Sequence, residues 1–385
     1  MRSSKNLSEP SCRLGFANDG HSFPRLKKKF YVYFVPGAIF QSIVVGGGYA
    51  TGREIVEYFT RLGWSEGLLA IASAFLVFAL VLSLTFEIGR IFKAYDYRSF
   101  FRVLIGKYWF VYELVAMVML LLTFAVLIAA ATTVLAQRFD LSSWIAVILI
   151  FGSIAILEFY GRDLVTRVLT LWSVVLYAVF IVFVYQVFNA IPDDHNFRVV
   201  GEQTDSVWWL SGFKYALYNM MVIPIILFVS RRFENRQQAV GAGVIAALVA
   251  VAPAALLHLA FCASGTDVVN ADVPVYAIMN AYTMPALSVA FAIMLVGTLI
   301  ETGAGLIQGI NERLDNQCIE TGHAPLSKLG HTGVALAFLG IALCVSSFGM
   351  IGLIAKGYGA MAWAFFMIYF LPLLSVGVSK LHRSR

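Results

Sequence analysis

Charged residues are scarce in this chain of 385 residues: they make up 13% of it, while 60% of the residues are hydrophobic and the mean hydropathy is +0.80. A soluble chain of this length could not bury so much apolar surface, so the composition predicts a protein that crosses a membrane several times. The net charge of +6 is spread over short loops instead of following one stripe, which argues against nucleic acid as a partner.

Cysteine is scarce as well, and the motifs of common enzymes are missing. The four cysteines (Cys12, Cys262, Cys318 and Cys344) show neither metal-site spacing nor a disulfide framework. The sequence contains no Gly-x-Ser-x-Gly, no His-Glu-x-x-His and no phosphate-binding loop. We therefore expect a protein that is not an enzyme and that holds no resident metal or cofactor.

Long apolar runs, in contrast, follow one another along almost the whole chain. A membrane-crossing helix needs about 20 apolar residues. Runs of this kind predict an all-α polytopic membrane protein whose surroundings are the lipid bilayer, with ten transmembrane helices at 30–60, 67–89, 110–136, 143–160, 164–188, 207–231, 239–262, 285–309, 332–350 and 359–378. The stretch 349–359 is compatible with either a loop or a helix.

The basic residues fall mainly on one side of this topology. Twenty-two of them lie in the terminal tails and in the loops after the even-numbered helices, against four in the opposite loops. Cytoplasmic loops are enriched in Lys and Arg. We therefore predict that both termini are cytoplasmic.

The first predicted helix contains a feature that a simple membrane anchor would lack. Gly46, Gly47 and Gly48 interrupt it, and each disfavours a helix by about 1 kcal/mol relative to Ala. Packing glycines would lie on one helix face, as Gly48 and Gly52 do, whereas three successive glycines cover all faces. We favour an unwound segment whose backbone groups bind a solute, with close helix packing as the alternative.

A second broken helix is predicted at the sixth span, which contains Lys214, Tyr218, Asn219 and Pro224 at mid-depth. Proline lacks an N–H group, which frees a carbonyl near Met220. The two breaks lie at similar depth, in helices that run in opposite directions and are five helices apart. This arrangement predicts two inverted five-helix repeats (30–190 and 207–378), joined by an external loop (191–206) and flanked by cytoplasmic tails (1–29 and 379–385).

The residues at the two breaks are the candidate substrate-binding residues. The N–H groups from Tyr49 to Gly52, at the start of the outer half-helix, would face the cavity with the positive end of a helix dipole and favour a carboxylate. The full set is Gly46, Gly47, Gly48, Tyr49, Ala50, Thr51, Gly52, Tyr218, Asn219 and Met220.

Three stretches resemble the YkvI-type bacterial membrane proteins: Gly46 to Tyr58, Tyr215 to Asn219 with Pro224, and Ala355 to Gly359. That group looks like a distant branch of the amino acid-polyamine-organocation superfamily, whose members share the LeuT-type fold. The resemblance implies a secondary transporter of the bacterial cytoplasmic (inner) membrane. It also implies a solute site between the first and sixth helices, with contacts from the third, eighth and tenth.

Charged residues at membrane depth are costly and indicate function by default. Arg53 and Glu57 are spaced i, i+4 and can neutralise each other, either as an external gate or as a structural pair. Glu54 is rotated by about 100° from Arg53, which makes it the better partner for a proton or a cation. Lys214 can extend to the membrane surface or pair with Glu54 or Glu57.

Glu301, in the eighth predicted helix, is a further candidate coupling residue. Thr298 and Thr302 share a helix face that Glu301 borders. In LeuT-type transporters, carbonyls of the broken first helix and hydroxyls of the eighth helix hold a sodium ion. Those hydroxyls are usually adjacent in sequence, whereas Gly303 follows Thr302 here. The coupling ion is therefore either sodium near Gly46, Thr298 and Thr302 or a proton on Glu301, and a structural role for this carboxylate is the alternative.

These observations predict a secondary active transporter of a small polar organic solute, such as an amino acid or another zwitterion. It would work by alternating access, as a symporter that uses a proton or sodium. A membrane sensor or receptor subunit that keeps the transporter fold is the alternative reading.

Overall fold

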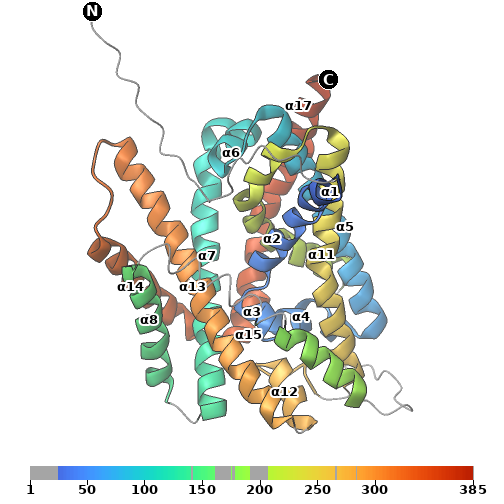
Figure 1. Ribbon diagram of the computed structural model, residues 1–385, viewed down its shortest axis with the longest axis vertical. Helices are drawn as coiled ribbons and strands as arrows, with labels where there is room; N and C mark the ends of the chain where they lie inside the picture. Colours follow the sequence, from blue (N-terminus) through green and yellow to red (C-terminus); the bar gives the residue numbers. More distant parts are fainter. Residues whose placement is uncertain are drawn as a thin grey trace, which may run out of the picture.

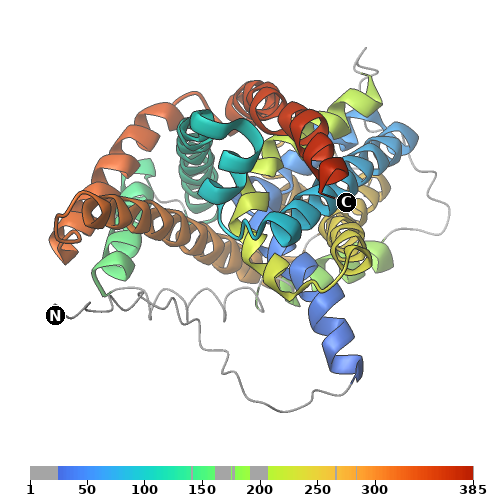
Figure 2. The same ribbon diagram turned by 90° about the horizontal axis from the view of Figure 1, so that it is seen from above.

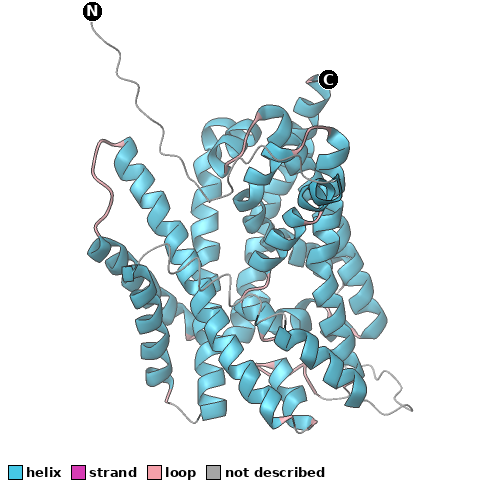
Figure 3. Ribbon diagram, viewed as in Figure 1, coloured by secondary structure: helices cyan, strands magenta, loops and turns pink. Residues whose placement is uncertain are grey.

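The structure is a computed structural model and describes residues 25–139, 142–160, 175, 178–190, 207–264, 267–282 and 284–384. Within these residues the chain is helical and contains no strand (Figure 3). The predicted external loop, most of the N-terminal tail and much of the predicted fifth helix lie outside the described residues.

The first predicted span is divided into short helices: α1 (Arg25–Tyr33), α2 (Val35–Val44), α3 (Gly47–Ala50) and α4 (Arg53–Tyr58). Val45 and Gly46 are not helical, and a second break follows at Gly52, whose φ is +82°. Glycine adopts this left-handed conformation without the clash that a Cβ causes. Of the three consecutive glycines, only Gly46 lies in the break, and the other two belong to α3.

Helices also form most of the remaining described chain. In order they are η1 (Thr60–Leu62), α5 (Trp64–Phe92), α6 (Tyr97–Ile105), η2 (Gly106–Tyr108), α7 (Trp109–Phe139), α8 (Ser143–Tyr160), an apolar helix at Ala178–Ala190, α10 (Trp208–Asn219), η3 (Met220–Arg232), α11 (Arg236–Ala263), α12 (Pro274–Ala281), α13 (Pro285–Glu320), α14 (Lys328–Ser346), α15 (Met350–Gly352), η4 (Leu353–Tyr358), α16 (Gly359–Phe365), η5 (Phe366–Phe370), η6 (Leu373–Gly377) and α17 (Val378–Arg383). Seven helical segments within the described residues are long and apolar enough to cross a membrane. The chain is therefore a multi-pass membrane protein.

The last helical segment begins earlier than predicted. α14 ends at Ser346 and α15 begins at Met350, with Gly349 at a φ of +74° between them. The chain turns at this glycine, and the segment that follows it is helical from Met350 onward. Lys356 therefore lies within this helical segment.

The helices pack in two groups. In the first group α5 packs against α10 and α11, and α11 packs against α2. In the second group α7, α8, α13 and α14 contact one another, and Figures 1 and 2 show α8, α13 and α14 on one side of the molecule. The short helix α3 contacts α7 and α13. The broken helix therefore lies where the two groups meet.

Small residues allow the first group to pack closely. A Cβ at Gly212 would overlap the carbonyl oxygen of Ala70, and a Cβ at Gly243 would overlap the backbone of Ser83. Close contacts between membrane helices depend on such small residues. Gly212 and Gly243 therefore allow α10 and α11 to pack closely against α5, which contacts both of these helices.

The two described ends of the chain lie at one end of the molecule. Figure 1 shows α1, α6 and α17 at this end and α12 at the opposite end. This arrangement is consistent with the predicted topology, in which both termini lie on the same side of the membrane.

Candidate functional site

A cavity of about 440 Å³ lies beside the first break of the broken helix. This volume is within the range of small-molecule binding sites. Its walls come from both groups of helices: Ser42, Ile43, Val44, Gly46, Gly48 and Glu54 of the broken helix, Met119, Thr123 and Leu127 of α7, Tyr218, Asn219, Met221, Val222 and Ile225 of α10 and η3, Thr302, Gly305 and Leu306 of α13, and Tyr358 of η4. The lining is largely apolar and carries a few polar groups.

Four of the ten predicted substrate-binding residues line this cavity, namely Gly46, Gly48, Tyr218 and Asn219. A Cβ at Gly46 would have no neighbouring atom within 4 Å, so this glycine faces open space. The cavity lining does not include the remaining six: Gly47, Tyr49, Ala50, Thr51, Gly52 and Met220.

Two of the four backbone amides from Tyr49 to Gly52 are used within the chain itself. The N–H groups of Ala50 and Gly52 donate to the carbonyls of Gly46 and Tyr49, at 2.8 and 2.9 Å. The prediction that the amides of this stretch bind a carboxylate is therefore wrong for Ala50 and Gly52. The physical reason is that the chain re-forms a helical turn immediately after Gly46 and satisfies its own donors.

Glu54 is the one charged residue of the cavity lining within the described residues. It is 5% exposed, and its Oε2 accepts a hydrogen bond from Tyr218 Oη at 2.6 Å. Its carboxyl group lies against the backbone of Gly48, where a Cβ would overlap Oε1. Gly48 is therefore required for a close approach, which is a different role from that of Gly46.

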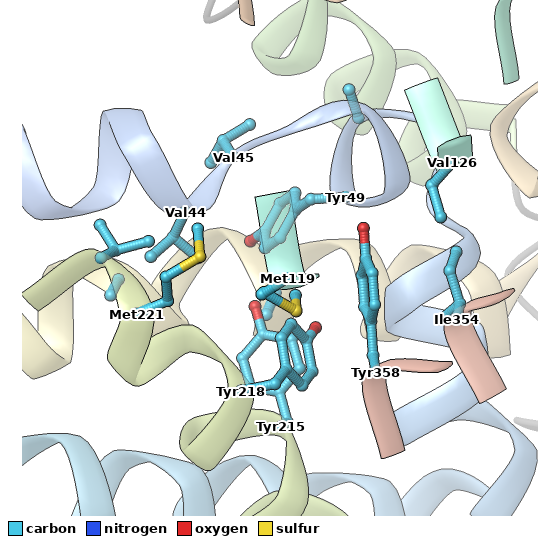
Figure 4. Packing of buried hydrophobic residues seen from close by; sticks show 14 of the residues in the cluster. Val44, Val45, Tyr49, Met119, Val126, Tyr215, Tyr218, Met221, Ile354 and Tyr358 are labelled. Carbon is cyan, nitrogen blue, oxygen red and sulfur yellow. The ribbon is translucent and has the colours of Figure 1, made fainter. Parts of the chain in front are cut away.

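Tyrosine rings surround this carboxyl group. The centroid of the Tyr218 ring lies 5.3 Å from that of Tyr58 and 4.9 Å from that of Tyr358. Figure 4 shows the rings of Tyr215 and Tyr218 next to each other and the ring of Tyr358 nearby. Tyr58 Oη also donates to the carbonyl of Ile354 at 3.2 Å, which ties α4 to η4. Aromatic rings therefore close the cavity on the α4 side.

Arg53 fastens α4 to the segment that precedes α12. Its guanidinium donates to the carbonyls of Val269 and Ala271, at 2.6 and 3.0 Å, and pairs with Glu57 at 2.9 Å. Glu57 also accepts from Arg61 at 2.8 Å. We call this set the Arg53 latch. The predicted i, i+4 pair is present, and Arg53, which is fully buried, makes long-range contacts that sequence spacing does not indicate.

The predicted break of the sixth span takes the form of a change in helix type. The α-helix α10 ends at Asn219, and a 3-10 helix continues from Met220 without a non-helical residue. Asn219 has a φ of −70°, and its Nδ2 donates to the carbonyl of Tyr215 at 2.9 Å. Asn219 is therefore helical, and its side chain bonds back onto the preceding helical turn.

The carbonyl that Pro224 leaves free belongs to Met221 and not to Met220. In a 3-10 helix each N–H group pairs with the carbonyl three residues earlier, whereas the prediction assumed an α-helix. Tyr112 Oη, from α7, donates to Met221 O at 2.9 Å. The missing proline donor is thus replaced by a side chain of the other helix group.

Lys214 does not form either of its predicted ion pairs. Within the described residues it makes no ion pair with Glu54 or Glu57, and its side chain is half-buried. Glu57 is bonded to the Arg53 and Arg61 side chains, and Glu54 is bonded to Tyr218.

The two threonines of the eighth predicted span, α13, lie in different surroundings. Thr302 lines the cavity, whereas Thr298 is buried and donates to the carbonyl of Met294 at 2.9 Å. Glu301 lies in α13, but its side chain is outside the part of the chain that the structure describes. A sodium site near Gly46, Thr298 and Thr302 stays a prediction.

Sequence reasoning missed Tyr58, Tyr112 and Tyr358 as parts of the site. A tyrosine hydroxyl at membrane depth needs a hydrogen-bond partner. That requirement could have identified them as residues in contact with polar groups. It could not have named the partners, because Ile354 and Met221 lie 296 and 109 residues away from Tyr58 and Tyr112.

No family model matches the sequence, and the comparison with curated proteins finds no match. Among solved structures, the chain is similar to a manganese transporter from Eremococcus coleocola in complex with an aromatic bis-isothiourea substituted compound. The two are 16% identical with a TM-score of 0.60, over 93% of this chain and 81% of that one.

A second similar structure is the substrate-bound outward-open state of a Na⁺-coupled sialic acid symporter. It is 14% identical with a TM-score of 0.54, and the match covers 90% of this chain and 81% of that chain. At these identities the similarity establishes the fold, which both neighbours share with this chain. The two reported neighbours are transporters and not enzymes.

Proposed function

We propose that this protein is a secondary active transporter of a small polar organic solute, with amino acids and related zwitterions as the first class to test. The observation that carries this proposal is the cavity at the helix break. It places Glu54, Tyr218 and Asn219 around a space of about 440 Å³, in a fold shared with transporters. Its mixture of apolar walls and a few polar groups is typical of organic solute sites.

The packing of the helices supports two inverted repeats of five spans. α5 contacts α10 and α11, which are the second, sixth and seventh predicted spans. α11 and α2 belong to the seventh and first spans, and their contact corresponds to that of α5 with α10, which belong to the second and sixth spans. Each span is thus replaced by the one five positions away in the order of the chain. The same shift converts the contact of α14 with α7 into that of α8 with α13. Such a repeat places a solute site where two discontinuous helices meet.

The uneven closure of the cavity supports alternating access. Ser42 and Ile225 line it and are exposed, so it reaches the surface on the side of α2 and η3. The tyrosine rings and the Arg53 latch close the other side. We assign the α1 and α17 end to the cytoplasm of a bacterial inner membrane because the basic residues lie mainly at the termini and connected loops. The structure then corresponds to an inward-facing state.

Uptake into proteoliposomes tests the proposal. A transporter accumulates a radiolabelled amino acid against its gradient when a proton or sodium gradient is applied. A sensor that keeps the fold binds the solute without accumulating it. Comparing uptake in sodium buffer and in choline buffer at fixed pH then identifies the coupling ion. If binding occurs and no gradient drives accumulation, the transporter proposal is overturned in favour of the sensor.

A further inference from the structure

We propose that the Glu54 carboxyl group binds either a proton or the ammonium group of the solute, and never both, so that the protein exchanges an amine for a proton. This inference rests on the proposed function and changes the mode of coupling from symport to exchange. Its chemistry is balanced. The protonated carboxyl group releases its proton to water, and the resulting carboxylate binds the protonated amine.

The position of Glu54 is the first observation behind this proposal. The residue lines the cavity, is 5% exposed and accepts a hydrogen bond from Tyr218. Tyr218 donates to Oε2, and Oε1 lies over the backbone of Gly48. One carboxyl oxygen is thus held in place by the protein, and the carboxyl group as a whole borders the space in which a solute would lie.

The charge around Glu54 is the second observation. No Lys, Arg or His is among the cavity-lining residues of the described chain. Arg53 is adjacent in sequence, but its guanidinium is bonded to Glu57, Val269 and Ala271. A buried ionised carboxylate without a cation is strongly unfavourable. Either a proton or a cationic ligand must therefore neutralise it.

Among the titratable groups of the described chain around Glu54, none is another carboxyl group or a cation that faces the cavity, so Glu54 is the group that exchanges a proton for the amine. The neighbouring elements contribute Tyr49 in α3, Tyr58 in α4, Tyr215 and Tyr218 in α10, and Tyr358 in η4. In α11, His258 and Cys262 face η1 and the start of α5, because His258 Nδ1 lies 3.1 Å from Thr60 Oγ1 and Nε2 lies 3.1 Å from the Trp64 carbonyl. From α7 and α13 the lining residues Thr123 and Thr302 carry no charge.

The tyrosine rings are the third observation, because they favour a cation over an anion. Tyr218 and Tyr358 line the cavity and their ring centroids are 4.9 Å apart. The negative face of an aromatic ring attracts an ammonium group. A carboxylate would instead be repelled by Glu54. The site therefore recognises a protonated amine, and a second charged group on the solute is not required.

Exclusive binding gives coupling without a separate ion site. When a proton occupies Glu54, the ammonium group has no counter-charge, and when the amine is bound, the proton has been released. The empty protein with an ionised Glu54 carries an unpaired buried charge, so it should change slowly between its inward-facing and outward-facing conformations. Each amine moved in one direction then requires a proton moved in the other direction. Proton release on amine binding is the direct signature of this cycle.

The test uses the purified full-length protein in weakly buffered detergent solution over a series of pH values. Matched probes are butylamine and butyrate, with phenethylamine, phenylacetate and phenylalanine as an aromatic set. We expect the amines to bind, to release up to one proton each, and to bind less tightly as the pH falls. In proteoliposomes an outward amine gradient should drive more proton uptake than in protein-free liposomes, whose bilayer the uncharged amine also crosses.

Three variants separate the role of Glu54 from general damage to the protein. Glu54→Gln keeps the shape and an acceptor for Tyr218, and should weaken amine binding by about ten- to hundredfold and abolish proton release. Tyr218→Phe keeps the ring and should still release a proton. Glu66→Gln, at an exposed carboxyl group outside the cavity, should behave as the unaltered protein.

Two results overturn the exchange proposal and leave transport itself standing. One is uptake of phenylalanine or phenylacetate while neither amine binds. The other is amine binding that releases no proton at any pH. If none of the probes binds, the exchange proposal is contradicted, and the transport proposal is decided by the uptake experiment described above.

Discussion

Gly46 and Gly48 differ by two positions in the sequence and have separate physical roles. A Cβ at Gly46 would meet open space, so an alanine is accommodated there, whereas a Cβ at Gly48 would overlap Glu54 Oε1. The expectation that both glycines act alike, as parts of one unwound run, therefore does not hold. Gly46 allows the break, and Gly48 makes room for the carboxyl group.

Alanine substitutions should separate these two roles. Gly48→Ala is expected to displace Glu54 from Tyr218 and to lower thermal stability, because a buried hydrogen bond to a carboxyl group contributes about 1.5–3 kcal/mol. Gly46→Ala is expected to leave stability unchanged or to raise it by up to about 1 kcal/mol through helix propensity, while weakening solute binding. Melting temperatures and solute binding of both variants provide the measurement. Equal destabilisation by the two alanines would contradict this assignment.

Arg53 is the second residue whose surroundings determine its effect. Its removal would leave the carbonyls of Val269 and Ala271 without a donor, and Glu57 would keep only Arg61. We expect Arg53→Ala to destabilise the protein by about 3–5 kcal/mol, the cost of breaking a buried ion pair. The matched control is Arg61→Ala, at a partly exposed pair worth about 1 kcal/mol or less. Similar melting temperatures for the two variants would show that the latch adds little.

At the scale of the element, the change from α10 to η3 depends on a residue of another helix. Pro224 cannot donate to Met221 O, and Tyr112 Oη of α7 takes the place of the missing N–H group. A buried carbonyl without a donor is unfavourable. α7 therefore stabilises the point at which the sixth span changes its winding, next to the cavity.

A double-mutant cycle tests this dependence. Tyr112→Phe alone should cost about 1–3 kcal/mol, because it leaves Met221 O without a donor. Pro224→Ala restores an N–H group that can bond to Met221 O in a 3-10 helix. In that background the cost of Tyr112→Phe should fall by at least about 0.5 kcal/mol. Strictly additive effects on the free energy of unfolding would contradict the proposed replacement.

At the scale of the whole molecule, the two helix groups meet at the cavity, and closure is concentrated on one side. Tyr58 joins α4 to η4 through the Ile354 carbonyl, and Ser211 Oγ donates to Tyr58 O at 2.6 Å. On the other side Ser42 and Ile225 are exposed. One side is therefore held by contacts between distant segments, and the opposite side is open.

Thiol labelling in membranes tests this asymmetry. In a background without the native cysteines, Ser42→Cys should react with a membrane-impermeant reagent applied to the cytoplasmic side, and Ser211→Cys, bonded at the closed side, should react slowly from either side. A transported solute should change both rates when alternating access operates. Labelling of Ser42→Cys only from the external side would contradict the assigned orientation.

The class of this protein and the place of its main discontinuity could both be predicted from the amino-acid sequence alone. Apolar runs longer than a bilayer is thick have no other stable arrangement than membrane helices, because each backbone group must be paired within the membrane. The break at Gly46 and the ion pair of Arg53 with Glu57 each depend on residues within one or two helical turns. Both could therefore be predicted from the local sequence. Both features are present in the structure.

The groups that meet in the cavity could not be predicted in this way, because their contacts depend on tertiary packing. Glu54 and Tyr218 are separated by 164 residues, and Tyr58 and Ile354 by 296. Local rules likewise could not indicate that the sixth span continues as a 3-10 helix, since that winding is supported by Tyr112 from another helix. Hydrogen bonds and burial at these points depend on how the two helix groups pack, and packing brings together residues that no sequence spacing connects.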